Sequence, residues 1–350
     1  MRQGVVSLAA PPSEAAGMAQ LCRVKGLRAV EPTLSHAEIA EQLGVSTRVK
    51  AAVSALNSDS GAALVDRQAI VSAFIQLLRN RSVFYSLLEG GGMVRVPRAT
   101  RIELATLDAT AWVVGQGKPV PLSSMAIDAQ SLDGRSAAAL TVLTANLLRF
   151  TQTERNITAA LRRAVSATVD DAFFNSVVDS STPSEVATGD DAEAAADGIA
   201  ALLEMVEPTT ESSLLLAADP AIVRRMAMLR TPAGNFLFPA LTPTGGNVQG
   251  VTVMPSDGVG AGNIALIDGS GIAGYAGDIE IDASGSADIE MLNAALQQDA
   301  LAPAHAQLVS MFQTNSVAIR VLTEFDAMRL RANAVAMLTG VSWGAPGSGA

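Results

Sequence analysis

The apolar positions with the clearest helical period lie between residues 151 and 179. They follow one another at spacings of four, four, three and four residues: Ile157, Leu161, Val165, Thr168 and Ala172. Such spacing places them on one face of a helix, whose charged residues, including Asp170 and Asp171, are expected to face solvent. Thr151 and Glu154 have the spacing of a capping box. At 1.5 Å per residue the helix would be roughly 40 Å long, which suits a structural spine.

Between residues 185 and 300 the pattern alternates between helices and short strands. A helix is predicted from Ala192 to Val206, before Pro208. Asp219 followed by Pro220 has the pattern of an N-cap with proline in the first turn, and it predicts a second helix through residue 229. Short apolar runs separated by glycine-rich turns predict strands at 213–217, 251–253, 264–267 and 279–281.

The first 150 residues contain helical and extended segments. Residues 1–57 fit two short helices, one of them opened by a capping box of Ser35 and Glu38. A helical pattern over 64–89 stops at three consecutive glycines, and residues 93–98 alternate as an edge strand does. Residues 102–143 are predicted to form a long two-stranded excursion. An isolated hairpin is marginal in water, so we expect it to lie against another part of the fold or against another subunit.

The composition of the chain argues against some classes of function. Apolar residues make up 49% of the chain but aromatic residues only 4%, which suits packing surfaces better than stacking on bases or sugars. The net charge of −10 argues against a sequence-reading nucleic-acid binder. Residues 1–57 carry six basic residues against four glutamates, so this segment is +2 and the remainder −12. The segment fits either a basic arm near DNA or a solvated helical leader.

Chemical motifs are weak throughout. The single cysteine, Cys22, excludes a disulfide framework within one chain. The only histidines, His36 and His305, have no cysteine or carboxylate at ligand spacing, and no apolar run reaches the ~18 residues of a membrane span. The glycines around Gly258 lack the helix that a dinucleotide loop requires, and Gly117-Lys118 lacks the rest of a phosphate loop. We therefore predict no catalytic, cofactor-binding or metal-binding residues.

The chain ends in a distinctive pattern over residues 310–344. A strand-like run at 317–322 is followed by a short charged segment, a second apolar run at 335–338, and the ending Gly-Val-Ser-Trp-Gly. This stretch resembles the C-terminal signature of tailed-phage major capsid proteins of the Hong Kong 97 type. Other segments resemble that family in the same order from about residue 61: Phe74 to Phe84, Val94 to Arg98, Ala111 to Pro121, Asn146 to Phe150, Leu215 to Pro220, Gly250 to Ser256 and Asn263 to Asp268.

The resemblance implies an α+β fold of the Hong Kong 97 type. Its expected parts are an N-terminal segment that is an arm or a residual scaffold (1–60), an N-arm with a following helix (61–92), an extended loop (93–145), the spine helix of the peripheral domain (146–184), an axial domain (185–300), the C-terminal strands of the peripheral domain (301–344) and a loose tail (345–350). The spine helix should bury a core of Ile157, Leu161, Val165 and Ala172.

The resemblance also implies a function. The chain would be a non-enzymatic major capsid protein of a tailed bacteriophage or prophage. It would associate with itself as hexamers and pentamers, and it would form an icosahedral head shell around double-stranded DNA. It would be assembled in the host bacterial cytoplasm and located in the virion capsid, without a membrane. DNA on the inner face and portal, scaffold and decoration proteins are the other implied partners.

Certain side chains are expected to lie between subunits. The candidates for intersubunit contact are Trp112, Lys118, Arg95, Arg98, Phe74 and Phe84. Some members of the family join a loop lysine to an asparagine of a neighbouring subunit, which makes Lys118 with Asn315 or Asn333 a candidate crosslink. An exposed cation that contacts an acidic neighbour is the alternative for Lys118, and we favour it.

Two other functions remain open at this point. An encapsulin-like compartment uses the same fold to hold enzyme cargo, and the contents of purified particles would distinguish it. An unrelated α/β enzyme with an unseen site is the other alternative. The small number of titratable residues argues against it, and a compact monomer in solution would argue for it.

Overall fold

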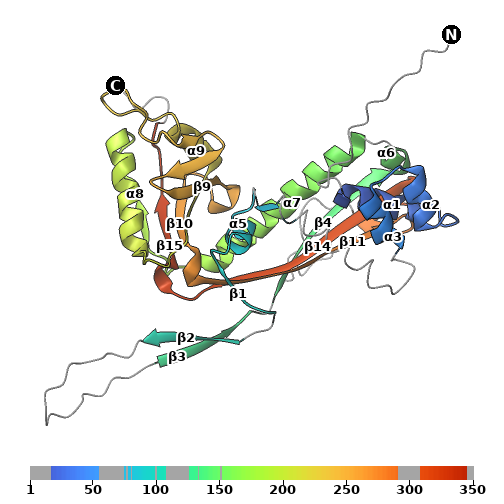
Figure 1. The fold of residues 1–350 in the computed structure, drawn as a ribbon, viewed down its shortest axis with the longest axis horizontal. Helices are drawn as coiled ribbons and strands as arrows, with labels where there is room; N and C mark the ends of the chain where they lie inside the picture. Colours follow the sequence, from blue (N-terminus) through green and yellow to red (C-terminus); the bar gives the residue numbers. More distant parts are fainter. Residues whose placement is uncertain are drawn as a thin grey trace. The chain divides into compact units, whose positions relative to one another are not determined.

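The computed structural model describes residues 17–54, 75, 78–79, 81–98, 101–107, 126–132, 134–149, 152–290 and 308–344 (Figure 1). The chain forms two compact units. Unit 1 consists of Met1–Asn80, Ala137–Ser166 and Asp278–Thr323, and unit 2 of Arg81–Ser136, Ala167–Gly277 and Glu324–Ala350. Four long elements have one end in unit 1 and the other end in unit 2: α7 (Gln152–Val177), β4 (Arg135–Thr144), β11 (Ile272–Ser284) and β14 (Ser316–Arg329).

Unit 1 contains a group of helices near the N-terminus: α1 (Gly17–Val30), α2 (His36–Gln42) and α3 (Thr47–Ser54). Most residues of α1 are buried, including the charged Arg23. The predicted capping box opens α2, because Ser35 Oγ accepts the N–H of Glu38 at 3.2 Å and the Glu38 carboxylate accepts the N–H of Ser35 at 2.7 Å. Unit 1 also holds α6 (Ala145–Arg149) and the antiparallel pair β12 (Asp288–Glu290) and β13 (Leu308–Ser310).

A seven-stranded sheet forms the centre of unit 2, in the order β5-β15-β10-β6-β9-β8-β7. The strands are β5 (Ser184–Val186), β6 (Leu214–Ala218), β7 (Leu241–Thr242), β8 (Gly245–Val248), β9 (Val251–Pro255), β10 (Ile264–Asp268) and β15 (Val335–Thr339). All five residues of β10 are buried, and Ile264 lies opposite Leu338 on one side and Ala218 on the other. The strands predicted at 213–217, 251–253 and 264–267 are confirmed as β6, β9 and β10. β6 and β10 are buried along most or all of their length, and such strands appear in a sequence as continuous apolar runs.

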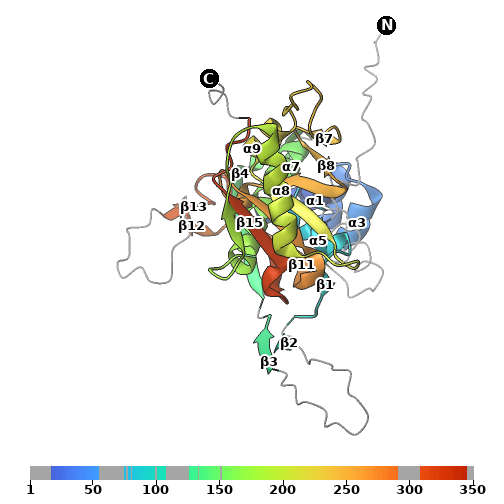
Figure 2. The ribbon, with the colours of Figure 1, turned by 90° about the vertical axis from the view of Figure 1, so that its left-hand side faces the viewer.

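Helix α8 (Ala192–Val206) covers β15 and β10, as Figure 1 shows, and Figure 2 shows it alongside β15. Its bounds are those predicted from the sequence. The side chain of Asp191 caps its first turn, and α9 (Pro220–Met226) is capped in the same way by Asp219. The apolar faces of both helices belong to one core cluster with the fully buried Trp343. A Cβ at Gly198 would lie 2.6 Å from the indole ring, so only glycine lets α8 approach Trp343 this closely.

The remaining strands belong to smaller sheets. Antiparallel pairing of β2 (Arg101–Leu107) with β3 (Ala126–Ser131) confirms a two-stranded excursion, while residues 108–125 lie outside the described residues. Its return leg, predicted to continue to residue 143, is shorter, because β4 instead belongs to a four-stranded sheet of order β1-β11-β14-β4. The predicted edge strand is β1 (Val94–Arg95), which pairs in parallel with β11.

Helix α7 is the predicted spine helix, but its buried face differs at the C-terminal end. Ile157, Leu161 and Val165 are buried as expected, and the face then continues through Val169, Phe173 and Val177 at spacings of four residues. Thr168 is exposed and Ala172 is only half-buried. The expectation that Ala172 belongs to the core face was therefore wrong. Two apolar faces are possible after Val165, and the one that carries Phe173 buries more surface.

The C-terminal signature is divided between the two sheets. β14 continues seven residues beyond Leu322, through the segment expected to be a charged connection. β15 then joins the seven-stranded sheet next to β10, whereas the sequence analysis grouped it with the peripheral domain. Similarly, β11 belongs to the four-stranded sheet, although its residues fall within the range assigned to the axial domain. Because the paired strands are far apart in the sequence, no local pattern predicts which of the two sheets each strand joins.

Candidate functional site

Catalytic and metal chemistry has little support in the described part of the chain. No group of three or more histidine, cysteine or acidic residues there could hold a metal ion. Burial raises the pKa of the Cys22 thiol to about 12, so the thiol stays protonated. Burial, with Arg28 and Lys25 nearby, lowers the pKa of His36. His305 lies outside the described residues, and within them no helix is long and apolar enough to span a membrane.

One buried polar site of unit 2 surrounds the carboxylate of Asp170. It accepts hydrogen bonds from Ser82 Oγ at 2.5 Å, Ser256 Oγ at 3.0 Å, and the N–H groups of Val83 and Phe84 at 3.1 and 3.3 Å. These donors begin α5 (Val83–Glu89) and precede the short helix η3 (Asp257–Val259), so one carboxylate ties both to α7. Burial raises the pKa of Asp170 to about 6 despite these bonds. The expectation that Asp170 faces solvent was therefore wrong, whereas Asp171 is exposed.

A second junction surrounds Asp268, at the end of β10. Its fully buried carboxylate accepts from Ser212 Oγ at 2.6 Å, Ser270 Oγ at 2.7 Å and the N–H groups of Ser213 and Ser270, each at 3.0 Å, and pairs with Arg331. Burial by itself would raise the pKa of Asp268, but the hydrogen bonds outweigh it and the pKa is lowered. This junction holds the ends of β10 and β14 together.

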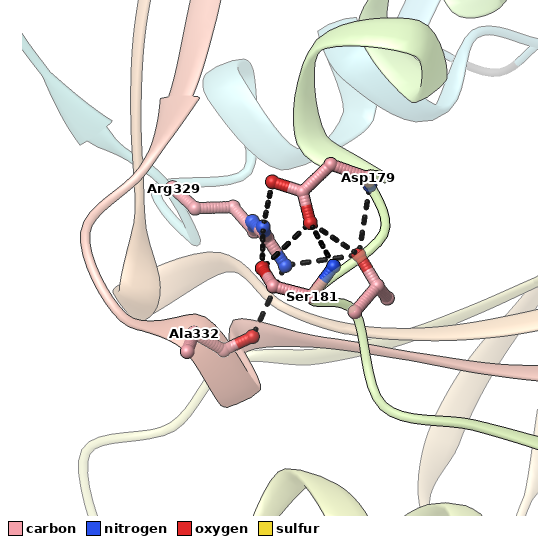
Figure 3. Close-up of polar contacts among 5 residues, drawn as sticks. Asp179, Ser181, Arg329 and Ala332 are labelled. Atoms are coloured by element: carbon pink, nitrogen blue, oxygen red, sulfur yellow. Dashed lines mark hydrogen bonds and ion pairs between the residues drawn. The ribbon is translucent and has the colours of Figure 1, made fainter.

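The third junction joins the end of α7 to the end of β14 (Figure 3). The Arg329 guanidinium pairs with Asp179 and donates to Ser181 Oγ at 3.0 Å, Thr182 Oγ1 at 2.9 Å and the carbonyl of Ala332 at 3.1 Å. Hydrogen bonds from Ser181 and then Arg329 lower the pKa of Asp179 to about 2. Arg329 and Arg331 thus fasten the segment between β14 and β15, and their role is structural.

Sequence reasoning missed all three junctions, although a local signal marks two of them. Asp179 and Asp268 each precede a serine by two residues, just after a helix or strand ends. In both, the aspartate accepts the N–H of that serine, which is an Asx-turn. Arginine partners from a distant strand could not have been identified from that signal.

The structure describes three of the six candidate intersubunit residues. Arg95 and Arg98 are exposed and pair with Glu89 at 2.7 Å and Glu324 at 2.8 Å, which contributes little to stability. Phe84 is fully buried, with its ring centroid 5.3–5.8 Å from those of Tyr85, Phe173 and Phe325, so as a contact between subunits it was wrongly assigned. Phe74, Trp112 and Lys118 lie outside the described residues.

Nothing in the described residues brings the candidate crosslink together, because Lys118 is outside them. Asn315 is exposed in the turn before β14 and has a positive φ of 48°, while its carbonyl accepts the N–H of Ala145 at 3.1 Å. Asn333 is half-buried in the short helix η5 (Ala332–Ala334). The crosslink therefore stays a prediction.

Exposed apolar side chains remain on both units. Phe312 in unit 1 is 81% exposed, and Val186 and Met228 in unit 2 are 68% and 60% exposed. Single exposed apolar side chains are common on protein surfaces, so these three do not by themselves mark a site. The carboxylates of Asp170, Asp179 and Asp268 are committed to internal junctions, and their role is structural.

Comparison with known proteins agrees with this. The capsid polyprotein of Pseudomonas phage PAJU2 is 27% identical over 326 residues, which cover 85% of this chain; the chain spans about half (48%) of that relative's length. Solved structures from Mycobacterium phage Ogopogo (TM-score 0.52) and Gordonia phage Cozz (TM-score 0.50) are each 14% identical, over 74% of this chain and 92% and 86% of theirs. This likeness shows the α+β fold of Hong Kong 97 type. Because the model of the phage capsid family matches residues 61–340, the chain belongs to that family.

Proposed function

We propose that this chain is a major capsid protein that assembles with itself into the icosahedral head shell of a tailed bacteriophage or prophage. The observation that carries the proposal is the family match over residues 61–340, which includes the whole seven-stranded sheet and the long helix α7. Electron microscopy of the purified protein tests it. Closed shells or rings are the expected result, and discrete monomers would contradict it.

Assembly of the shell would depend on contacts between copies of this chain. A contact between two different patches of the same chain repeats from copy to copy and closes into a ring, which supplies hexamers and pentamers. The pair β2 and β3 has no third strand in its sheet, and such a hairpin is marginal by itself. Covering a neighbouring copy would stabilise it. The shell then shares burial between subunits.

The same function sets the partners and the location. Double-stranded DNA would be enclosed and touched non-specifically, since a chain of net charge −10 offers few cations to phosphate. A portal, a scaffold and decoration proteins are the other partners in this proposal. Assembly would take place in the host bacterial cytoplasm, the finished location is the virion capsid, and the role is not enzymatic.

We also propose that residues 17–54 stay in the assembled subunit, because they are part of the core of unit 1. Arg23 is fully buried and its Nε donates to the carbonyl of Leu148 at 2.7 Å, while Lys25 Nζ donates to the carbonyl of Ile281. Two of the basic residues that fitted a DNA-facing arm are thus bonded internally. A segment removed as scaffold would expose this surface of α6 and β11.

Gly26 gives a test of that packing. A Cβ at this position would lie 2.9 Å from Leu148 Cδ1, so Gly26→Leu overpacks the contact and should lower the free energy of unfolding by about 1–3 kcal/mol. Ala37→Leu adds a side chain at an exposed position of α2 and should change it by less than about 0.5 kcal/mol. Urea unfolding of both variants measures this. Equal stability would mean that α1 does not pack against α6.

A further inference from the structure

A cationic hollow lies beside α9 in unit 2. A cavity of about 350 Å³ is lined by Ala221, Arg224, Arg225, Met228, Leu229 and Gly344. Arg224 is exposed, and Met228 is 60% exposed at the rim. Arg230 does not line the cavity but follows Leu229, which does; it is exposed and stacks 4.3 Å over the ring of Phe236, itself 44% exposed. The hollow thus combines positive charge with apolar surface.

None of these arginines forms an ion pair within the described part of the chain. Arg225 Nε donates to the carbonyl of Ala221 at 3.3 Å, and Arg230 Nη1 donates to the carbonyl of Gly234 at 2.9 Å. Carbonyl groups orient a guanidinium but do not neutralise its charge. This contrasts with Arg329 and Arg331 of the same unit, which pair with carboxylates. A cationic hollow with an apolar rim fits an acidic, partly apolar occupant.

Helix α8 has the complementary surface. Its exposed face carries Glu193, Asp197, Glu204 and Glu207, the last as the C-cap, and this set is called the acidic stripe. The spacings of four, seven and three residues place the stripe on one face, about 21 Å long. Exposed Ala196 and Ala200 lie along it, and α8 contains no lysine or arginine. Within the described ranges, no member of the stripe is paired with a cation.

In one copy the two surfaces are not paired with each other. Both helices pack into the same core cluster, through residues such as Leu202 and Ile222, and none of the ion pairs among the described residues of unit 2 joins α8 to α9. Oppositely charged patches on one unit suit a head-to-tail contact between copies. A second copy of this chain therefore offers a surface of complementary charge to the hollow.

We infer that the acidic stripe of α8 docks into the cationic hollow beside α9 of the next copy, and that this contact sets the order of subunits around each ring. The inference rests on the proposed shell function and specifies one of its contacts. Charge complementarity would select the partner and align it, and Met228 would be covered in the contact.

Charge reversal in matched sets tests the contact. One set, the stripe set, carries Asp197→Lys and Glu204→Lys. The other, the hollow set, carries Arg224→Glu in the hollow and Arg230→Glu next to its lining residue Leu229. Each set alone places like charges together and should lower the fraction of protein in shells at least about tenfold, since charge juxtaposition of this kind costs several kcal/mol. All four changes in one chain restore opposite charges, and shell yield should return to within about twofold of wild type. Sedimentation measures the yield.

Controls separate the contact from folding and from net charge. Glu41→Lys with Glu280→Lys makes on unit 1 the same change in net charge as the stripe set, and should leave shell yield unchanged. Circular dichroism and thermal midpoints should match wild type in every variant, because all these side chains are exposed. If both variants that carry one set still form shells, the proposed contact is wrong. It is also wrong if the folded variant with all four changes does not recover shells. Either result leaves the shell function standing. Wild-type protein that never assembles would overturn the shell function and this contact with it.

Discussion

Asp170→Ala should lower the free energy of unfolding by about 3–5 kcal/mol, because it leaves four buried donors without their acceptor. The donors are the hydroxyls of Ser82 and Ser256 and the N–H groups that begin α5. Losing the acceptor should detach both α5 and η3 from α7. Urea unfolding, with fluorescence and circular dichroism as separate probes, measures the change.

The neighbouring residue provides the control. Asp171 is exposed, so Asp171→Ala removes the same charge and should cost less than about 0.5 kcal/mol. If the two variants were equally stable, Asp170 would not be the buried acceptor that holds these elements together.

The same carboxylate makes stability depend on pH in a defined direction. Its pKa in the folded protein is about 6, above its ordinary value of 3.8, so the folded state binds the proton more tightly. The contribution is fully present below about pH 4 and is lost as pH rises through about 6. Asp170→Asn cannot titrate. The stability difference, wild type minus variant, should therefore fall by up to about 3 kcal/mol between these values.

Leu161→Asp should abolish soluble, assembled protein. Leu161 is 3% exposed on the apolar face of α7, and an unpaired buried carboxylate costs several kcal/mol. Leu161→Ala should lower the free energy of unfolding by about 2–5 kcal/mol and reduce shell yield without abolishing it. Soluble yield, thermal unfolding and sedimentation of particles measure the series.

Arg163→Gln is the matched control on the same helix. Arg163 is exposed and, among the described residues, bonds only to the Ala159 carbonyl, at 3.3 Å, one turn earlier, so assembly should stay near wild type. Arg162 is a poorer control, because it is half-buried and its Nε is enclosed. If Leu161→Asp formed as many shells as Arg163→Gln, this face of α7 would not be packed.

The elements of this fold could be predicted where local pattern alone decides them. Helix α8 was placed to the residue, with the proline that follows it marking its end. The strands β6 and β10 appear as buried apolar runs between turns, and β9 as a shorter run interrupted by the exposed Thr252. The family signature at residues 310–344 then supplied the fold type, which no single element could have supplied.

The predictions that failed concern residues whose contact partners are distant in the sequence. Asp170 appeared solvated beside Asp171, because its donors Ser82 and Ser256 are 88 and 86 residues away. Phe84 appeared available to a neighbour for the same reason, since Phe173 and Phe325 enclose it. The charge complementarity of α8 and α9 was also missed, because exposure and the absence of internal partners cannot be read from spacing.

Cryo-electron microscopy of the purified, assembled protein tests the central claim most directly. The account predicts closed shells built from rings of five and six copies, with the fold of unit 2 visible in each copy and α8 of one copy facing α9 of the next. A homogeneous population of compact monomers, or particles whose subunits have another fold, would contradict it.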